Sequence, residues 1–170
     1  SQNRPVVRYQ KKDIIYHEGD SPAFLFFLIS GQIKTHKAHE ADREYVTSLY
    51  KAGDFFGYVS LLQNAVYEDS AVAMEDCEVC KIPKADFTAL MYKNRDVAGK
   101  FIKMLSGSVS ERERRLLSLA YDTVRKRVAD ALVSLNNRAG GKSLRISVTR
   151  DDLAGMAGTA TETVIRSLSD

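Results

Sequence analysis

Residues 1–94 alternate between short apolar runs and turn-forming residues. Runs such as AFLFFLIS and SAVAM are rich in β-branched and aromatic residues, and turn signals interrupt such runs about every ten residues. The stretch REYVTSLYKAGDFFGYVSLL alternates in the same way around Gly53 and Gly57, and it predicts further strands. The pattern is typical of an antiparallel β-sandwich or barrel. A short helix over ADFTALMYKN is expected to follow these strands.

From Arg95 the apolar spacing changes from that of a strand to that of a long helix. The spacings are three and four residues, at Ile102, Leu105, Val109, Arg112, Leu116 and Leu119. This is the a/d seam that one helix presents to a partner helix, and Arg112 is its charged member. A helix that lies on its own sheet for part of this length is the alternative. We expect a homodimer held by the seam.

The end of the chain predicts a helix-turn-helix. After a helix over residues 123–138, LRISV predicts a short strand, and VTRDDLAGMAGTATETVIRSLSD predicts two helices around Gly158. Thr149 opens an acidic variant of the capping box and Thr159 opens a standard one. Two short capped helices joined by a tight Gly turn form this motif. The apolar residues expected to pack the two helices together are Leu153, Ala157, Val164, Ile165 and Leu168. For Ile165, an orientation away from the helix pair is the alternative.

The last helix carries side chains suited to reading DNA bases. Glu162 and Arg166 are four residues apart and share one helical face. Arg can bind guanine O6 and N7 and Glu can accept from cytosine N4, so the pair could read one G·C pair or two neighbouring ones. Thr161 and Thr163 can contact phosphate or a thymine methyl, and Arg150 suits a backbone phosphate. An ordinary i,i+4 ion pair is the alternative for Glu162 and Arg166.

The charge distribution agrees with nucleic-acid binding. Residues 1–123 carry 17 Lys/Arg and 17 Asp/Glu, whereas residues 124–170 carry 8 and 5, which accounts for the whole net charge of +3. A basic bias confined to one end points to nucleic acid. Catalytic motifs such as a phosphate loop or His-Glu-x-x-His do not occur, so we expect no enzyme.

The chain also lacks the signals of export. No apolar run approaches the ~18 residues of a membrane helix, and there is no basic-then-apolar leader. We therefore expect no membrane association and a cytoplasmic location. Because the chain begins at Ser1 rather than at a methionine and stops near the end of its last helix, we expect it to be part of a longer protein.

Two series of motifs in combination resemble the catabolite activator and fumarate-nitrate regulator (Crp/Fnr) family. IIYHEGD, LFFLISGQIKTHK and YKAGDFFG resemble that family's cyclic-nucleotide-binding-type β-roll, and VTRDDLAGMAGTATETVIRSL resembles its helix-turn-helix. The resemblance implies an α+β fold: a β-roll sensor domain (1–94), a dimerisation helix and hinge (95–121), and a winged helix-turn-helix domain (122–170) whose wing is truncated.

The same resemblance implies what the protein does. It implies a homodimeric, sequence-specific transcription regulator that binds a pseudo-palindromic site in double-stranded DNA, with RNA polymerase as a further partner. It assigns base reading to Glu162 and Arg166. Thr161 stands where the catabolite activator has a further Arg, so the readout looks closer to that of the fumarate-nitrate branch.

The resemblance also assigns residues 57–70 to the cassette that holds the phosphate in cAMP-binding members. There the cassette begins Gly-Glu and ends Arg-Ser, whereas this chain has Gly57-Tyr58 and Asp69-Ser70. Arg112 stands near the turns where the long helix of cAMP binders supplies small hydroxyl side chains to the purine. A buried phosphate needs a paired cation, and Asp69 would repel it. These departures argue against cAMP.

Other effectors have weaker support or stay open. An iron–sulfur cluster needs four cysteine ligands, and the chain has Cys77 and Cys80 only, at strand spacing. His17, His36 and His39 are candidate ligands for haem or a metal only by residue type, so we expect no cluster, haem or metal. An uncharged or cationic ligand, a protein signal and no ligand at all remain open. The alternative function is a regulatory module of a larger protein that does not read DNA.

Overall fold

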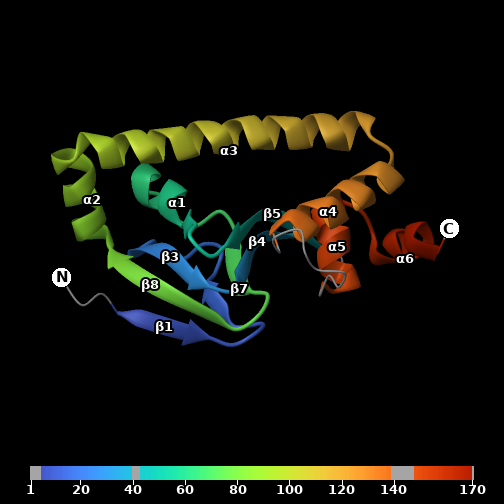
Figure 1. Ribbon diagram of the computed structural model, residues 1–170, viewed down its shortest axis with the longest axis horizontal. Coiled ribbons are helices and arrows are strands. Elements are labelled where there is room, and N and C mark those ends of the chain that lie inside the picture. Colours follow the sequence, from blue (N-terminus) through green and yellow to red (C-terminus); the bar gives the residue numbers. More distant parts are fainter. Residues whose placement is uncertain (1–4, 40–42, 139–147, 170) are drawn as a thin grey trace. The chain divides into compact units, whose positions relative to one another are not determined.

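The computed structural model describes residues 5–39, 43–138 and 148–169; Figure 1 colours the chain from its N-terminus in blue to its C-terminus in red. The chain divides into two compact units, Ser1–Thr35 with Ser48–Ser110, and His36–Thr47 with Glu111–Asp170. The predicted strand LRISV falls almost wholly outside the described residues.

The strands form two four-stranded sheets. The strand order of the first sheet is β1 (Val6–Tyr9), β8 (Cys77–Pro83), β3 (Phe24–Ser30) and β6 (Phe55–Phe56). That of the second is β2 (Ile14–Tyr16), β7 (Ser70–Ala73), β4 (Gln32–His39) and β5 (Arg43–Lys51). The pairs β1–β8, β3–β8, β3–β6 and β2–β7 are antiparallel. The predicted β-roll is confirmed.

Alternation along the strands separates two cores. Successive side chains of a strand point to opposite faces, so Phe26 and Leu28 of β3 lie in one buried cluster and Leu25 lies in the other. Members of the first cluster include Tyr16, Phe26, Leu28, Ile33, Phe56, Tyr67 and Val79. Members of the second are Leu25, Tyr58, Leu61, Ile82, Phe87 and Phe101.

The prediction of strand over residues 58–63 is wrong, because this segment is helix α1 (Tyr58–Gln63). Left-handed residues bound it, with φ of 77° at Gly57 and 53° at Asn64. Tyr58 and Leu61, three residues apart, are buried on the same side against the second core. Over six residues, apolar alternation and a short helix cannot be told apart by periodicity, and the Gly57 turn decides the outcome.

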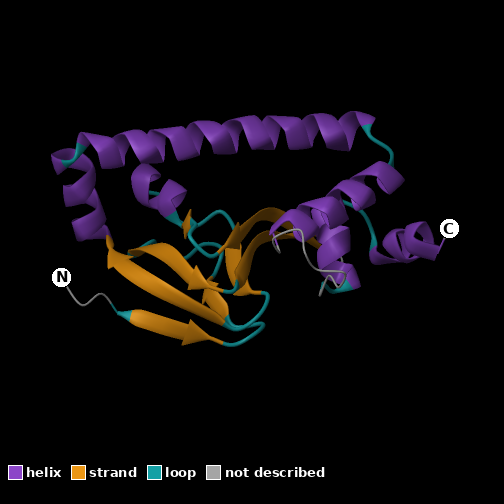
Figure 2. Ribbon diagram, in the orientation of Figure 1, coloured by secondary structure: helices purple, strands orange, loops and turns teal. Residues whose placement is uncertain are grey.

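The other helices follow in the predicted order. They are α2 (Lys84–Lys93), α3 (Arg95–Tyr121), α4 (Val124–Arg138), α5 (Arg150–Ala157) and α6 (Thr161–Ser169). Figure 2 shows the strands in orange and the helices in purple. None of the helices in the described residues is long and apolar enough to cross a membrane.

Candidate functional site

The first helix of the C-terminal pair begins and ends as predicted. The Thr149 hydroxyl accepts a hydrogen bond from the backbone N–H of Asp152 at 3.0 Å, which caps α5. Asp151 and Asp152 lie in the first turn, where negative charge is favoured by the helix dipole. Gly158 ends the helix in the left-handed region with a φ of 63°.

The capping box predicted at Thr159 does not form. The backbone N–H of Thr163 donates to the Ala160 carbonyl at 3.1 Å, so Ala160 takes the N-cap position of α6. The Thr161 hydroxyl instead donates to Asp151 Oδ1 at 2.8 Å, which joins the start of α6 to the start of α5. A bond between the two helices has replaced the local cap.

The outer face of α6 presents Glu162 and Arg166 to solvent. Both side chains are exposed, and neither makes an ion pair or hydrogen bond with any residue that the structure describes. The i,i+4 ion pair that was the alternative interpretation is therefore absent between these two residues. Val164 is 0% exposed and anchors the opposite face of the helix. Arg150 is exposed at the start of α5, and Thr163 is half-buried.

Ile165 lies near the base-reading pair, which agrees with the alternative that it points away from the helix pair. Its exposed fraction is 40%. It lies three residues after Glu162, and hence beside it on the helix surface. Its neighbour Val164 is 0% exposed, and the two side chains lie about 100° apart around the helix.

Two arginines from other helices bind the C-terminal end of α5, and neither was predicted. Arg115 of α3 donates from Nη2 to the Met156 carbonyl at 3.1 Å. Arg127 of α4 donates from Nε to the Ala157 carbonyl at 2.8 Å. Cations at a helix C-terminus satisfy its free carbonyls and oppose the negative end of the dipole. These contacts join residues far apart in sequence, so no local sequence pattern predicts them.

Arg115 and Gly155 also bring residues 43–47 against α5. Arg115 Nη1 donates to the Thr47 carbonyl at 2.9 Å, and the guanidinium lies 5.0 Å from the centre of the Tyr45 ring. A Cβ at Gly155 would stand 2.8 Å from the Glu44 carbonyl oxygen, too close for a side chain. The strand backbone therefore packs directly on the first helix of the pair.

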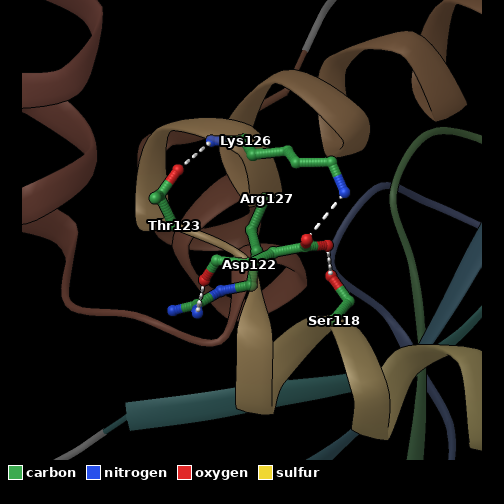
Figure 3. Close-up of polar contacts among 5 residues, drawn as sticks. All are labelled: Ser118, Asp122, Thr123, Lys126 and Arg127. Atoms are coloured by element: carbon green, nitrogen blue, oxygen red, sulfur yellow. Dashed lines mark hydrogen bonds and ion pairs between the residues drawn. The ribbon is translucent and has the colours of Figure 1, made fainter.

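The turn between α3 and α4 is held by polar contacts around Asp122, which Figure 3 shows. Its carboxylate accepts from the Ser118 hydroxyl at 2.8 Å and pairs with Lys126 Nζ at 2.7 Å. The Lys126 contact, followed by the Ser118 contact, holds the pKa of the Asp122 carboxyl below its usual value. Arg127 Nη1 donates to the Asp122 carbonyl at 3.1 Å. The turn is thereby linked to the arginine that binds α5.

Three apolar residues of the predicted seam form an exposed stripe on α3. Ile102, Val109 and Leu116 are 61%, 66% and 68% exposed, and they recur every seven residues. Side chains at this interval lie on one line along a helix that pairs with another helix. Arg112 is exposed as well.

Two other members of the predicted seam face their own chain. Leu105 packs partly buried against the second core, beside Phe101. Leu119 lies against Gly158, where an added Cβ would be 2.6 Å from its Cδ2 atom. The alternative of a helix lying on its own chain therefore applies to these two positions.

The residues of the predicted effector pocket have different surroundings. Tyr58 is 6% exposed in the second core, and its hydroxyl lies 3.3 Å from Ser108 Oγ of α3. Gly57 instead adjoins the first core, where an added Cβ would be 2.9 Å from the Phe26 ring. Ser70 Oγ accepts from the Glu18 backbone N–H at 2.9 Å.

The Asp69 carboxylate acts electrostatically on Tyr16, a tyrosine of the first core. Burial, and then the negative charge of Asp69, raise the pKa of Tyr16 well above its usual value. The hydroxyl therefore stays protonated and able to donate.

The cysteines and histidines lie apart. Cys77 is buried in the first core, where its thiol donates to the Gln32 carbonyl at 3.3 Å, and Cys80 packs against the second core. His17 is exposed. His36 Nε2 lies 3.4 Å from Glu44 Oε1. Within the described ranges, no group of three or more potential metal ligands comes together.

Two family descriptions match this architecture. Residues 6–94 match the cyclic nucleotide-binding domain, and residues 126–170 match the Crp-like helix-turn-helix domain.

Individual relatives cover nearly the whole chain. The cyclic AMP receptor protein of Thermus thermophilus is 32% identical over 160 residues, which are 94% of this chain and 73% of that protein. The c-di-GMP responsive regulator CLP of Xanthomonas campestris has a TM-score of 0.83 at 23% identity, over 98% of this chain and 85% of that one. FixK2 of Bradyrhizobium japonicum has a TM-score of 0.83 at 24% identity, over 98% of this chain and 83% of that one. These two structures support the fold alone. With the domain matches and the Thermus relative, we conclude that the chain belongs to the Crp/Fnr family of DNA-binding transcription regulators.

Proposed function

We propose that a homodimer of this protein binds a pseudo-palindromic DNA site with one α6 in the major groove of each half-site. Glu162 and Arg166 then read a G·C pair, with Arg166 on guanine and Glu162 on cytosine. The observation that carries the proposal is that both side chains are exposed and unpaired among the described residues, on a helix anchored by Val164. A recognition helix meets base edges with its N-terminal residues, where Glu162 stands.

The surrounding residues support this docking. Arg150, exposed at the start of α5, is placed to contact a backbone phosphate. Thr161 holds α6 to α5 through Asp151, so its main contribution is to position the reading face. Thr163 supplies a further polar contact at the DNA backbone, and RNA polymerase is the partner that family membership suggests.

Selection from random duplexes tests the function. We expect the purified protein to enrich sites with two-fold related half-sites, each holding a G·C pair. The logarithm of the affinity should fall linearly with the logarithm of salt concentration, by about 0.9 per phosphate contact. If no duplex is enriched and binding stays undetectable at low salt, the protein is a regulatory module without DNA readout.

Ile165 is expected to contact a thymine methyl beside the G·C pair. An exposed aliphatic group on a reading face recognises this methyl, which is the apolar feature of the major groove. Replacing the neighbouring thymine by deoxyuridine removes that one group, and we expect roughly 0.8 kcal/mol of loss per half-site, which is about fourfold. Fluorescence anisotropy with matched duplexes measures the change.

The Ile165→Ala variant is the control for this contact. It should bind the thymine and deoxyuridine duplexes equally well, because the partner of the methyl is gone. A full deoxyuridine effect in this variant would show that another residue makes the contact.

A further inference from the structure

The interior of the β-roll is filled by stacked aromatic side chains. The Tyr16 and Tyr67 rings lie 3.7 Å apart at 12°, and the Phe26 and Phe56 rings lie 4.9 Å apart at 15°. Tyr16 also stacks on Phe26 at 5.7 Å, and Tyr50 meets Phe56 at 5.4 Å. Tyr16, Phe26, Phe56 and Tyr67 are 7% exposed or less. Four rings at these separations leave no layer between them for a planar base, because stacked rings are already in contact.

This aromatic stack, Tyr16, Phe26, Phe56 and Tyr67, adjoins the two ends of the cassette. At the first end, a Cβ on Gly57 would stand 2.9 Å from the Phe26 ring and 3.6 Å from the Tyr67 hydroxyl. At the second end, the negative charge of Asp69 acts on the buried Tyr16. The rings therefore lie where the cassette of a nucleotide-binding relative would face its ligand.

The Asp69 carboxylate is the wrong kind of polar group for a phosphate. Asp69 brings a negative charge, which repels a phosphate at short range. Ser70 Oγ accepts a hydrogen bond from the backbone N–H of Glu18. Lys81 Nζ lies 6.0 Å from the centre of the Phe26 ring, and closer to the Phe24 and Tyr9 rings, at 5.5 Å and 5.7 Å. These rings hold the ammonium by cation–π attraction.

We infer that the aromatic stack is a built-in occupant of the β-roll: Tyr16 and Tyr67 take the place of a cyclic nucleotide, so the roll binds no nucleotide and DNA binding requires none. The rings supply the apolar contacts that a base would make. The roll is then a preset support for α3: the Tyr58 ring of the roll packs against the Phe101 ring of α3. The part that concerns DNA rests on the proposed function, and the part that concerns the roll does not.

Calorimetry and thermal unfolding of the wild-type protein test the roll without DNA. The probes are cAMP, cGMP and c-di-GMP, each at 1 mM. We expect no heat of binding and no change in melting temperature beyond measurement error. A ligand at 100 times its Kd would raise the melting temperature by several degrees. Saturable binding of any of the three would overturn the inference.

A cavity variant tests whether Tyr16 is the occupant. We expect Tyr16→Ala to lower the melting temperature and to gain saturable binding of p-cresol, the tyrosine side chain as a free molecule. Bound p-cresol should restore part of the lost melting temperature. Engineered apolar cavities accept ligands of this shape. Wild type and Tyr92→Ala, which truncates a tyrosine that is 87% exposed, should show no such recovery. If folded Tyr16→Ala gains no p-cresol binding, Tyr16 does not fill a ligand space.

Two further measurements keep the outcomes distinct. If Tyr16→Ala does not fold, wild-type calorimetry still decides whether nucleotides bind. With the selected duplex, the three nucleotides should change wild-type affinity by less than twofold, and a tenfold increase would overturn the inference. Failure to bind any duplex would contradict the proposed function while leaving the calorimetric result on the roll valid.

Discussion

Replacing Arg166 with alanine is expected to remove the preference of the protein for its DNA site while leaving its fold intact. A bidentate Arg–guanine contact contributes about 1–3 kcal/mol of discrimination. A homodimer loses it in both half-sites, so the expected loss is roughly 2–6 kcal/mol, or about 30-fold to 10⁴-fold. The exposed Arg166 has no partner among the described residues, so truncation breaks no internal contact. Anisotropy titrations with the selected and a scrambled duplex measure the ratio of the two affinities.

Arg8→Ala is the matched control for this change. Arg8 is another exposed arginine, on β1, where it pairs with Glu78 at 2.9 Å. The Arg8→Ala variant should leave the affinities for the selected and the scrambled duplex unchanged. Arg166→Ala should still bind the scrambled duplex within a few-fold of wild type, because phosphate contacts supply non-specific affinity. An unchanged specificity ratio in Arg166→Ala would remove the base-reading role.

Introducing a charge in the exposed stripe of α3 is expected to convert a dimer into monomers. Leu116 is 68% exposed, so Leu116→Glu should not disturb the folded chain. In a helix pair it would lose about 1.5–3 kcal/mol of burial on each side and would place two carboxylates near each other. Each recognition helix would then bind its half-site alone, with a loss of affinity of at least ~100-fold. Light scattering reports the mass, and anisotropy reports the affinity.

The neighbouring residue provides the control. Leu117 is 55% exposed and lies about 100° around the helix from Leu116. Leu117→Glu should therefore remain dimeric if the seam follows the stripe Ile102, Val109 and Leu116. A monomeric wild-type protein, or equal loss of dimer in both variants, would contradict the proposed seam.

Local signals account for most of what could be predicted. The strand-rich first half, the change to helices and the capped α5 all follow from spacing, turn residues and caps, which act within a few residues. Gly158 is a clear case, since its left-handed turn separates α5 from α6. The failure at residues 58–63 has the same origin, because the segment is too short for its apolar spacing to distinguish strand from helix.

The sequence alone predicted the order of the elements apart from α1, the family it resembles and the face of α6 that carries Glu162 and Arg166. Those features depend on short-range backbone preferences, which neighbouring residues determine. Contacts across the chain decided the rest. Arg115 and Arg127 meet the end of α5 from two other helices. Tyr16 and Tyr67 stack although 51 positions separate them. Such pairs leave no local pattern, because packing joins side chains by their position in space rather than by their spacing in sequence.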